Sequence, residues 1–331
     1  MTTRMSTAVV ILNWNGLDFL TKFLEGVVRM TPQASVIVAD NGSDDASLEW
    51  IAENFTREQV RVIALDKNYG FTGGYNRALA ALEGEFDYFL LLNSDIEVTP
   101  GWLEPLVEFM DSHPECGACA PKTRSWHYRD CFEHAGAAGG YLDRFFFPYC
   151  RGRVMDHVEK DYGQYDDPAN CFWVSGAAFM VRSSIWKRLG GLDESFFAHM
   201  EEIDFCWRAR LQGWQVWSVP SSVIYHVGGG TLPNNSPRKI YLNFRNNLLM
   251  MYKNLPTKWR GPLIFERMLI DGVLATIYLV TGKREFFKMV IRAHSDFRKM
   301  KKHCVTSERT VNLKRPHGIL FIRRFRIFVE N

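Results

Sequence analysis

The chain has 331 residues, 47% hydrophobic and 14% aromatic, a composition that indicates a globular core and excludes a disordered chain. Its seven cysteines are odd in number and no signal peptide precedes Val9, so we expect a reducing compartment rather than a disulfide-stabilised secreted protein. The net charge of +3 is unevenly distributed, because residues 253–331 carry 18 Lys and Arg against 6 Asp and Glu, whereas residues 1–252 carry 22 against 31. This asymmetry predicts that a basic C-terminal region meets an anionic surface.

In the first hundred residues, apolar runs alternate with helical patterns. The expected strands are Ala8–Leu12, Val36–Ala39, Val60–Leu65 and Tyr88–Leu92. Three helices are expected between these strands. The first follows the first strand and ends at Met30, the second runs from its N-cap Ser47 to Phe55, and the third spans Tyr75–Leu82. Alternation of this kind is typical of an α/β protein with a largely parallel sheet. Because βαβ crossovers are right-handed, we expect the carboxyl ends of all four strands on one edge, where the polar residues that follow them line one cleft.

The rest of the chain predicts a cover over this cleft and a helical C-terminal region. Residues 122–170 are expected to form loops and short strands. The elements expected after them are a strand at Phe172–Val181, helices at Ser183–Leu189 and Glu202–Gln212, short strands at Gln215–Val219 and Val223–Tyr225, and helices near 238–253, 259–281 and 284–302. We therefore expect an α/β domain over residues 1–236 and a basic, amphipathic helical extension over residues 237–331.

Charged residues interrupt the longest apolar stretch of this extension, at Glu266, Arg267 and Asp271. They exclude a membrane-spanning helix. Two interpretations stay open for the extension. It either lies in a membrane interface, with its cations on anionic headgroups, or packs as a lid on the α/β domain with a solvated basic face.

The most informative segment is Leu90-Leu91-Leu92-Asn93-Ser94-Asp95, where an apolar run ends in an acid. A carboxylate at this edge can hold a divalent cation, which in turn can bind a diphosphate; the alternative is that Asp95 only caps the turn toward Pro100. After the second strand, residues 40–44 can offer a carboxylate to a nucleobase or ribose, or form an ordinary Asx turn. After the third, the glycine-rich residues 68–76 open a helix and can bring the backbone close to a diphosphate, although they match neither the P-loop nor the dinucleotide-binding spacing.

Acidic residues also cluster around an aromatic segment at 194–204. Glu201 and Glu202 are adjacent, so their side chains diverge at the start of the expected helix, and one can face the cleft while the other turns into the scaffold. The alternative is that both negative charges only stabilise the helix, through their interaction with the positive end of its dipole. Asp204 and Arg208 are four residues apart and are expected to pair on the helix. His226 ends an apolar strand, where it is either a metal ligand or a satisfied polar residue.

Six motifs occur in order along the chain. They are Val9-Val10-Ile11-Leu12-Asn13-Trp14-Asn15-Gly16, the cluster that begins at Asp40, Asn68-Tyr69-Gly70-Phe71-Thr72-Gly73-Gly74-Tyr75-Asn76, Leu92-Asn93-Ser94-Asp95, Gly176-Ala177-Ala178-Phe179-Met180 and Glu201-Glu202-Ile203-Asp204. Over roughly residues 7 to 250, this set resembles the family 2 inverting glycosyltransferases with the GT-A fold, and within them a bacterial rhamnosyltransferase-like branch. The resemblance implies the GT-A (nucleotide-diphospho-sugar transferase) fold, a mostly parallel sheet flanked by helices, with a C-terminal helical extension.

The resemblance also implies roles for single residues. Asp40 would contact the nucleotide base, and Asp95 and His226 would bind Mg²⁺ or Mn²⁺ on the donor diphosphate. In place of the family's Asp-x-Asp the chain has Asn-Ser-Asp, so Asp95 is the one strong ligand in that motif. The second acid of the later pair, Glu202, would be the general base, with Glu201 as its rival. The remaining donor-binding candidates are Asn13, Asn15, Asn41, Asp44, Asn68, Gly70, Gly73, Gly74, Asn76, Asn93 and Ser94.

The implied reaction is direct displacement at the anomeric carbon of a sugar, in which the base takes the proton of an acceptor hydroxyl and the cation stabilises the departing nucleoside diphosphate. The resemblance suggests dTDP-rhamnose or a UDP-sugar as donor. The acceptor would be a hydroxyl of a glycan or a lipid-linked oligosaccharide in surface polysaccharide biosynthesis. We expect a cytoplasmic enzyme that binds anionic lipid on the inner face of the cytoplasmic membrane as a peripheral protein. We expect no nucleic-acid partner, because no known recognition motif accompanies the basic charge.

Two other functions stay open. A nucleotidyltransferase also uses acids at strand ends, but it should carry a basic glycine-rich loop after the first strand, and Asn13-Trp14-Asn15-Gly16 supplies no Lys or Arg. A catalytically degenerate, membrane-bound scaffold is favoured by Asn93 alone. The retained Asp95, Glu202 and His226 oppose it.

Overall fold

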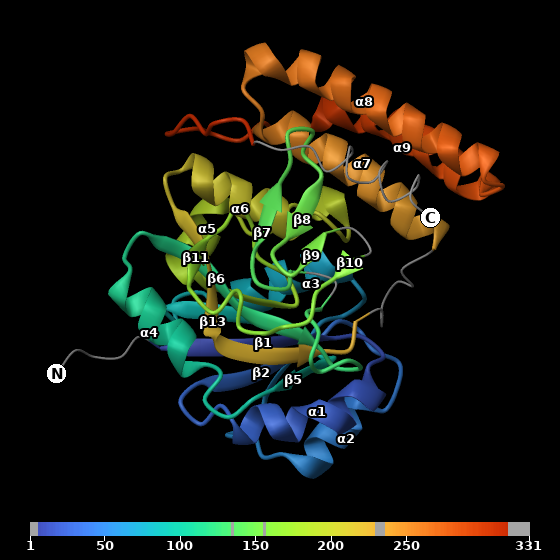
Figure 1. The fold of residues 1–331 in the computed structure, drawn as a ribbon. Coiled ribbons are helices and arrows are strands. Elements are labelled where there is room, and N and C mark those ends of the chain that lie inside the picture. The colour runs from blue at the N-terminus through green and yellow to red at the C-terminus, as the bar shows by residue number, and fades with distance from the viewer. Residues whose placement is uncertain (1–5, 134–135, 155–156, 229–235, 317–331) are drawn as a thin grey trace.

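The computed structural model describes residues 6–133, 136–154, 157–228 and 236–316, and these residues form a central sheet with helices on both faces (Figure 1). In the described residues the strands of a nine-stranded sheet run in the order β11-β13-β6-β12-β4-β1-β2-β3, with β5 paired to β13. The strands are β1 Thr7–Asn13, β2 Ser35–Asp40, β3 Arg61–Ala64, β4 Tyr88–Asn93, β5 Ile96–Val98, β6 Cys116–Ser125, β11 Ala169–Asn170, β12 Ala178–Arg182 and β13 Gln215–His226.

Helices cover both faces of this sheet. Those that precede β13 are α1 Leu17–Arg29, α2 Ser47–Asn54, α3 Gly70–Ala80, α4 Glu104–Ser112, α5 Ser183–Leu189 and α6 Glu201–Leu211. In Figure 1, α1 and α2 lie below the sheet, and α5 and α6 lie above it. Along β1, Val9 packs in one core with Leu20 of α1, whereas Val10 packs in the other core with Tyr75 of α3. The strand is therefore buried on both faces, as its continuous apolar run predicts.

The first four strands run parallel, as predicted. β1 pairs in parallel with β2 and β4, and β2 pairs in parallel with β3. The whole sheet, however, is mixed rather than largely parallel, because β12 enters antiparallel between β4 and β6. Between β6 and β12 the described residues form loops and short strands instead of a crossover helix, and such a connection permits the reversal.

Two helix starts differ in detail from the prediction. α3 begins earlier than predicted, at Gly70, because the side chain of Asn68 accepts a hydrogen bond from the Gly70 N–H (2.7 Å) and holds a first turn made of poor helix formers. α2 begins at Ser47, but the Ser47 hydroxyl does not cap it. Instead, the Asp45 carboxylate accepts hydrogen bonds from the N–H groups of Ser47 (3.1 Å) and Leu17 (3.1 Å), which ties the starts of α1 and α2 together.

The region predicted as loops and short strands contains a small antiparallel sheet. Its strands are β7 Gly140–Leu142, β8 Pro148–Cys150, β9 Arg153–Val154 and β10 His157–Val158. β13 is one long strand where two short ones were predicted, and a register shift between Val219 and Val223 marks the interruption that the sequence shows.

The C-terminal helices are α7 Pro237–Asn254, α8 Thr257–Val280 and α9 Arg284–Met300, and two short 3₁₀ turns are η1 Glu194–Phe196 and η2 Lys301–His303. α7 packs on the body of the protein, where Asn246 donates to the carbonyl of Phe196 (2.9 Å). After η2 the chain returns to α6, where the Thr310 N–H donates to the carbonyl of Leu211 (2.9 Å). In the part of the chain that the structure describes, no helix has the length and apolar content to cross a membrane.

Candidate active site

The loops after β1 and β2 are joined by polar side chains that the sequence singled out. Asn13, which is fully buried, donates to Asp40 Oδ1 (3.0 Å). Asp40 also accepts hydrogen bonds from the hydroxyl (2.6 Å) and the N–H (2.9 Å) of Ser43. Both carboxylate oxygens of Asp40 are therefore engaged, and the residue is 1% exposed. The proposed base-contacting acid lies at the predicted strand end, inside a hydrogen-bonded turn.

The rim of the same turn is open to solvent. Asn15 and Asp44 bind one another, since Asn15 Nδ2 donates to Asp44 Oδ1 (2.5 Å) and the Asp44 N–H donates to Asn15 Oδ1 (2.9 Å). Between Asn13 and Asn15, Trp14 exposes 52% of its surface. We did not select Trp14 from the sequence, although an aromatic residue directly after a buried strand is a signal for it. Its ring can stack on a planar ligand.

The glycine-rich segment packs α3 closely against the strands. Asn41 donates to Asn68 Oδ1 (3.1 Å) and to the Gly70 carbonyl (3.0 Å), which joins the loop after β2 to the first turn of α3. Gly70 has a φ of 71°, a left-handed conformation that favours glycine. A Cβ atom at Gly74 would lie 2.7 Å from a side-chain carbon of β1, and one at Gly73 would lie 3.0 Å from Tyr69 and Arg77. Gly74 thus lets the helix N-terminus approach the sheet edge.

Other predicted donor-binding residues lie on either side of this segment. The amide of Asn76 accepts from the Leu192 N–H (2.9 Å) and donates to the Leu192 carbonyl (2.8 Å), so it ties α3 to the segment before α6. The Asn93 N–H donates to the carbonyl of Ala177 (2.9 Å), which joins the end of β4 to the Gly176-Ala177 motif. Ser94 lies near Gly16, where an added Cβ would be 3.7 Å from the Ser94 hydroxyl.

Asp95 and His226 come together as predicted. The pairing of β5 with the end of β13 places His226 opposite Ile96, and His226 Nε2 lies 3.2 Å from Asp95 Oδ1. On the other side of the ring, Nδ1 lies 3.4 Å from Glu133 Oε2. Asp95, His226 and Glu133 are each 7% exposed. Burial alone would lower the pKa of His226, but the hydrogen bonds and charges of the two carboxylates raise it to about 10. We did not predict Glu133, because it lies in an irregular region without a sequence pattern.

The chemistry of this donor set fits a divalent cation shared with a diphosphate. A carboxylate is a ligand that Mn²⁺ accepts, and an imidazole can bind a cation once it has lost the proton that it shares with a carboxylate. Mg²⁺ is commonly bound by one or two carboxylates together with substrate phosphates. Within the described ranges, no group of three or more His, Cys, Asp and Glu side chains is arranged to hold a metal ion. Asp95 and His226 would therefore hold such an ion only together with ligand oxygens. Glu133 lies behind His226, where a carboxylate fixes the orientation of a ligating ring.

The acid pair lies at the first turn of α6, near the end of β4. Glu202 lies beside Gly176, where an added Cβ would be 3.7 Å from the Glu202 Cβ and 3.4 Å from the ring of Phe71. Glu201 is 5% exposed, and Oε2 of each glutamate is buried without a hydrogen-bond partner in the described structure. Burial, partly offset by backbone N–H donors, raises the pKa of Glu202 to about 7. Burial and the neighbouring charge of Glu202 raise the pKa of Glu201 well above its ordinary value. A carboxyl group with a pKa near neutrality is suited to general base catalysis.

The segment before this pair is strained and held by α7. Phe197, His199 and Met200 have φ values of 66°, 67° and 73°, which non-glycine residues rarely adopt. The side-chain amide of Asn246 donates to the carbonyls of Phe196 (2.9 Å), Ala198 (2.8 Å) and His199 (2.8 Å). Such strain persists only where surrounding contacts enforce it, and it concentrates at functional sites. Asn246 therefore positions the start of α6 and the two glutamates with it.

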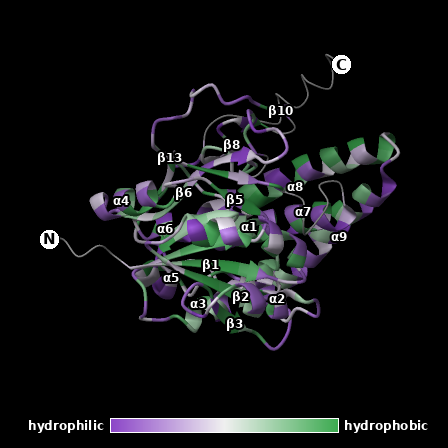
Figure 2. Ribbon diagram, turned by 90° about the horizontal axis from the view of Figure 1, so that it is seen from below, coloured by the Kyte–Doolittle hydropathy of each residue, from purple (hydrophilic) through white to green (hydrophobic). Residues whose placement is uncertain are grey.

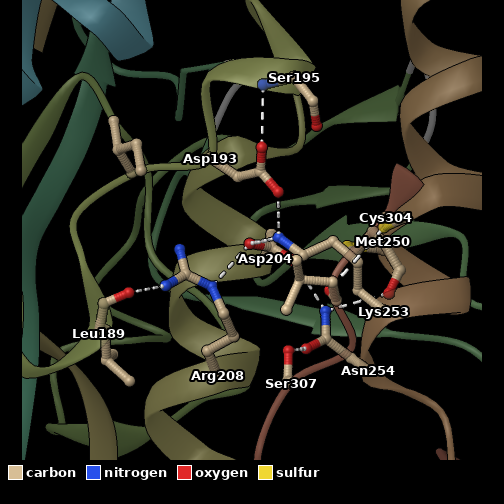
Figure 3. A network of polar contacts seen from close by, with 12 residues as sticks. Leu189, Asp193, Ser195, Asp204, Arg208, Met250, Lys253, Asn254, Cys304 and Ser307 are labelled. Atoms are coloured by element: carbon tan, nitrogen blue, oxygen red, sulfur yellow. Dashed lines mark hydrogen bonds and ion pairs between the residues drawn. The ribbon is translucent and has the colours of Figure 1, made fainter. Parts of the chain in front are cut away.

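A buried polar network locks α6 to α7 on the other side (Figure 3). Asp204, fully buried, accepts hydrogen bonds from Arg208 (2.8 Å), Lys253 (2.8 Å) and Asn254 (2.8 Å). Figure 3 also shows Ser307 of the C-terminal segment, whose hydroxyl donates to Asn254 Oδ1 (2.6 Å). The predicted pair of Asp204 and Arg208 is confirmed as a structural contact.

The fold that carries this edge is the GT-A fold, and solved structures share it. The structure of GalNAc-T7 with UDP, GalNAc and Mn²⁺ aligns with a TM-score of 0.63 at 16% identity, over 92% of this chain and 56% of that chain. The structure of S. aureus TarS 1–349 in complex with UDP-GlcNAc aligns with a TM-score of 0.59 at 16% identity, over 91% of this chain and 84% of that chain.

The chain belongs to glycosyl transferase family 2, whose model matches residues 8–185. A similar protein of known name is the N-acetylglucosaminyl-diphospho-decaprenol L-rhamnosyltransferase of Mycobacterium tuberculosis, with 24% identity over 281 residues, 81% of this chain and 90% of the relative. The rhamnosyltransferase WbbL of Escherichia coli is 23% identical over 223 residues, 66% of this chain and 82% of the relative. The predicted family and GT-A fold are thereby confirmed, and the protein is a glycosyltransferase.

Proposed function

We propose that this glycosyltransferase moves a sugar, with inversion, from a nucleoside diphosphate donor to a hydroxyl of a glycan or lipid-linked oligosaccharide in surface polysaccharide synthesis. The observation that carries the proposal is the position of Glu202. Its buried carboxyl group has a pKa of about 7 and lies beside the Gly176-Ala177 motif, which is bonded to the end of β4 that leads into Asp95. In this proposal Glu202 is the base, and it lies next to the edge that would bind the diphosphate.

In the proposed mechanism, the Glu202 carboxylate accepts the proton of the acceptor hydroxyl. The hydroxyl oxygen then forms its bond to the anomeric carbon as the bond from that carbon to the diphosphate breaks. Asp95 and His226 would hold Mg²⁺ or Mn²⁺, which would neutralise charge on the departing diphosphate. Glu201 remains the alternative base, because it shares the start of α6 and is the more deeply buried of the two.

The donor would lie along the carboxyl edge of β1, β2 and β4. In this proposal Trp14, Asn15 and Asp44 form the rim of the nucleoside site, and the N-terminus of α3 faces the diphosphate. Asp40 holds the turn that carries this rim, through its hydrogen bonds with Asn13 and Ser43. The similarity to two rhamnosyltransferases supports dTDP-rhamnose as the donor, with UDP-sugars next. Family membership disfavours the nucleotidyltransferase alternative, and the presence of Asp95, His226 and Glu202 at one edge disfavours a degenerate scaffold.

We further propose that residues 1–236 form the catalytic domain, on which α7 of the C-terminal extension packs. The M. tuberculosis relative is named for a diphospho-decaprenol acceptor, which supports a lipid-linked acceptor here. An acceptor of that kind would bring the enzyme to anionic lipid on the cytoplasmic face of the membrane, where the basic C-terminal region fits.

A thermal-shift screen of dTDP-rhamnose, UDP-GlcNAc and UDP-GalNAc, each with and without Mn²⁺, tests the proposal. A true donor at about 100 times its Kd should stabilise the fold by about 3 kcal/mol, and the gain should depend on Mn²⁺. Asp95→Ala should remove the Mn²⁺-dependent part, whereas the control Asp18→Ala, exposed on α1, should keep it. A gain that survives Asp95→Ala in full would refute the metal assignment, and no gain with any nucleotide sugar would refute the function.

A further inference from the structure

Helix α8 carries its charges inward and apolar side chains outward. Arg267 and Asp271, which interrupt the apolar sequence, are 3% and 0% exposed and form a 2.7 Å ion pair. Arg267 also donates to Asn247 of α7 (2.5 Å), and Asp271 lies 3.2 Å from His294 of α9. These contacts use the polar groups of α8 to attach it to its neighbours.

The opposite face of α8 is apolar and exposed. Phe265, Leu269 and Val273 follow at intervals of four residues and are 65%, 57% and 45% exposed, and Leu279 and Val280 at the end of the helix are 43% and 76% exposed. Residues at such intervals share one face of a helix. The exposed positions between 261 and 280 are all uncharged; they are Gly261, Pro262, Phe265, Leu269, Val273, Thr276, Leu279 and Val280. At 1.5 Å per residue the face is about 30 Å long. A soluble surface usually carries exposed apolar residues singly, not in a continuous face of this length.

Positive charge borders this face. Residues 257–303 carry 11 Lys and Arg against 4 Asp and Glu. Lys258 is exposed at one end of α8, and Lys283 in the turn to α9 and Arg284 at the start of α9 are exposed at the other end. The acids are already paired: Glu285 with Lys288 (2.8 Å), Asp296 with Lys299 (3.3 Å), Glu266 with Arg315 (2.8 Å) and Asp271 with Arg267.

The apolar end of the α8–α9 hairpin lies on the side of the active site. Ile240 and Tyr241, near the start of α7, pack in one cluster with Tyr278 and Phe287 at the end of the hairpin. Beside them, Lys239 lies within electrostatic range of Glu133, the carboxylate behind His226. Figures 1 and 2 both show α8 and α9 projecting past the sheet together, and Figure 2 shows the hydrophobic residues along α8.

We propose that the exposed face of α8, with the cations of the α8–α9 turn, docks on an anionic lipid bilayer and holds the active site at its surface. The inference rests on the proposed function in one respect, that the acceptor is lipid-linked. A second copy of the chain fits the face less well. Two such faces packed antiparallel would place Lys258 of one copy near Lys283 and Arg284 of the other, with no free acid between them. A bilayer offers hydrocarbon to the apolar face and phosphate to its borders.

Co-sedimentation of the full-length protein with vesicles tests the proposal. The vesicles are phosphatidylcholine alone, or phosphatidylcholine with about 30 mol % phosphatidylglycerol, at about 0.02 M and about 0.5 M NaCl. Two variants change the surface: Leu269→Gln/Val280→Gln removes apolar area, and Lys283→Gln/Arg284→Gln removes charge. Their matched controls are Val305→Gln, 83% exposed on the C-terminal segment, and Arg29→Gln/Arg57→Gln on the body.

We expect the native protein and both controls to bind anionic vesicles at low salt and to be released at high salt. Each cation removed should weaken binding about fivefold, and the apolar variant should lose binding by more than about tenfold. Native protein that stays in the supernatant would overturn the proposal, as would binding that neither surface variant weakens. A dimer in light scattering that only Leu269→Gln/Val280→Gln dissociates would instead assign the face to a second copy.

Thermal shift with nucleotide sugar and Mn²⁺ on the same proteins separates this proposal from the proposed function. Surface variants that keep the donor-induced shift but lose vesicle binding support docking by this face and show that the fold is intact. Vesicle binding without any donor-induced shift would contradict the proposed function and leave the docking surface in place.

Discussion

Replacing Glu202 by Gln should stabilise the protein at alkaline pH while it removes activity. The carboxyl group lies at the start of α6 with Oε2 buried and unpartnered in the described structure, and Gln has nearly the same size without the charge. Burial raises the pKa of Glu202 in the folded protein from its ordinary 4.5 to about 7. When this carboxyl group is ionised, the fold therefore holds a negative charge that burial disfavours.

The magnitude follows from linkage. At about 1.36 kcal/mol per pKa unit, a shift from 4.5 to about 7 corresponds to about 3 kcal/mol. Because the pKa of this acid is raised in the folded protein, the free energy of unfolding loses nothing to Glu202 below pH 4.5. The loss grows as pH rises from 4.5 and is complete above pH 7. Glu202→Gln should therefore be nearly neutral at pH 4 and more stable than the native protein by about 3 kcal/mol at pH 8. Activity has the opposite dependence, since the native enzyme should gain turnover as pH rises through 7 and the variant should lose it by about a hundredfold or more.

Urea unfolding at pH 4 and pH 8, together with turnover, measures both effects. Glu53→Gln, on the exposed face of α2, is the matched control and should change neither. Glu201→Gln should also gain stability at pH 8, because Glu201 is buried beside Glu202, but should lose less turnover. Equal destabilisation of Glu202→Gln at both pH values would refute the view that Glu202 is a desolvated base. A larger loss of turnover in Glu201→Gln would move the base to that residue.

Two further predictions concern positioning and stability. Glu133→Gln should weaken Mn²⁺-dependent donor binding about tenfold in calorimetric titration, because Glu133 orients the ring of His226. The melting temperature without ligand should stay nearly constant. An unchanged Kd would make Glu133 a packing residue. Asp204→Asn should cost about 3 kcal/mol in urea unfolding, because it leaves Arg208 buried beside a neutral group, while Lys253 keeps its pair with Asp193. Glu85→Gln, which breaks an exposed pair with Arg61, should cost less than about 1 kcal/mol. Similar losses for the two variants would contradict this ranking.

Local pattern was sufficient for the strands and their ends. β1, β2 and β4 lie within a residue of the predicted bounds, because each is an apolar run that ends in polar residues. The same ends brought Asp95 to the edge where His226 lies. The direction of β12 could not be predicted, because pairing depends on how the irregular residues 126–177 fold back, and no sequence period records that.

The side chains that were missed act through tertiary contacts. Glu133 has no neighbour in the sequence that marks it, and only the fold places it beside His226. The early start of α3 depends on Asn41 and Asn68, which bind its first turn from outside the helix. Arg267 and Asp271 indicated that α8 is no spanning helix, but their inward orientation could not be predicted. The spacing of apolar residues along a helix does not say which of its faces packs against the rest of the protein.

α7 links the base to the proposed membrane surface. One side of α7 carries Asn246, which holds the strained carbonyls before Glu201, and another carries Phe244, which packs with Leu274 of α8 and Val290 of α9. The contacts that attach the hairpin and the contacts that hold the segment before the acid pair therefore share α7, so the proposed membrane surface and the proposed base are joined through one helix.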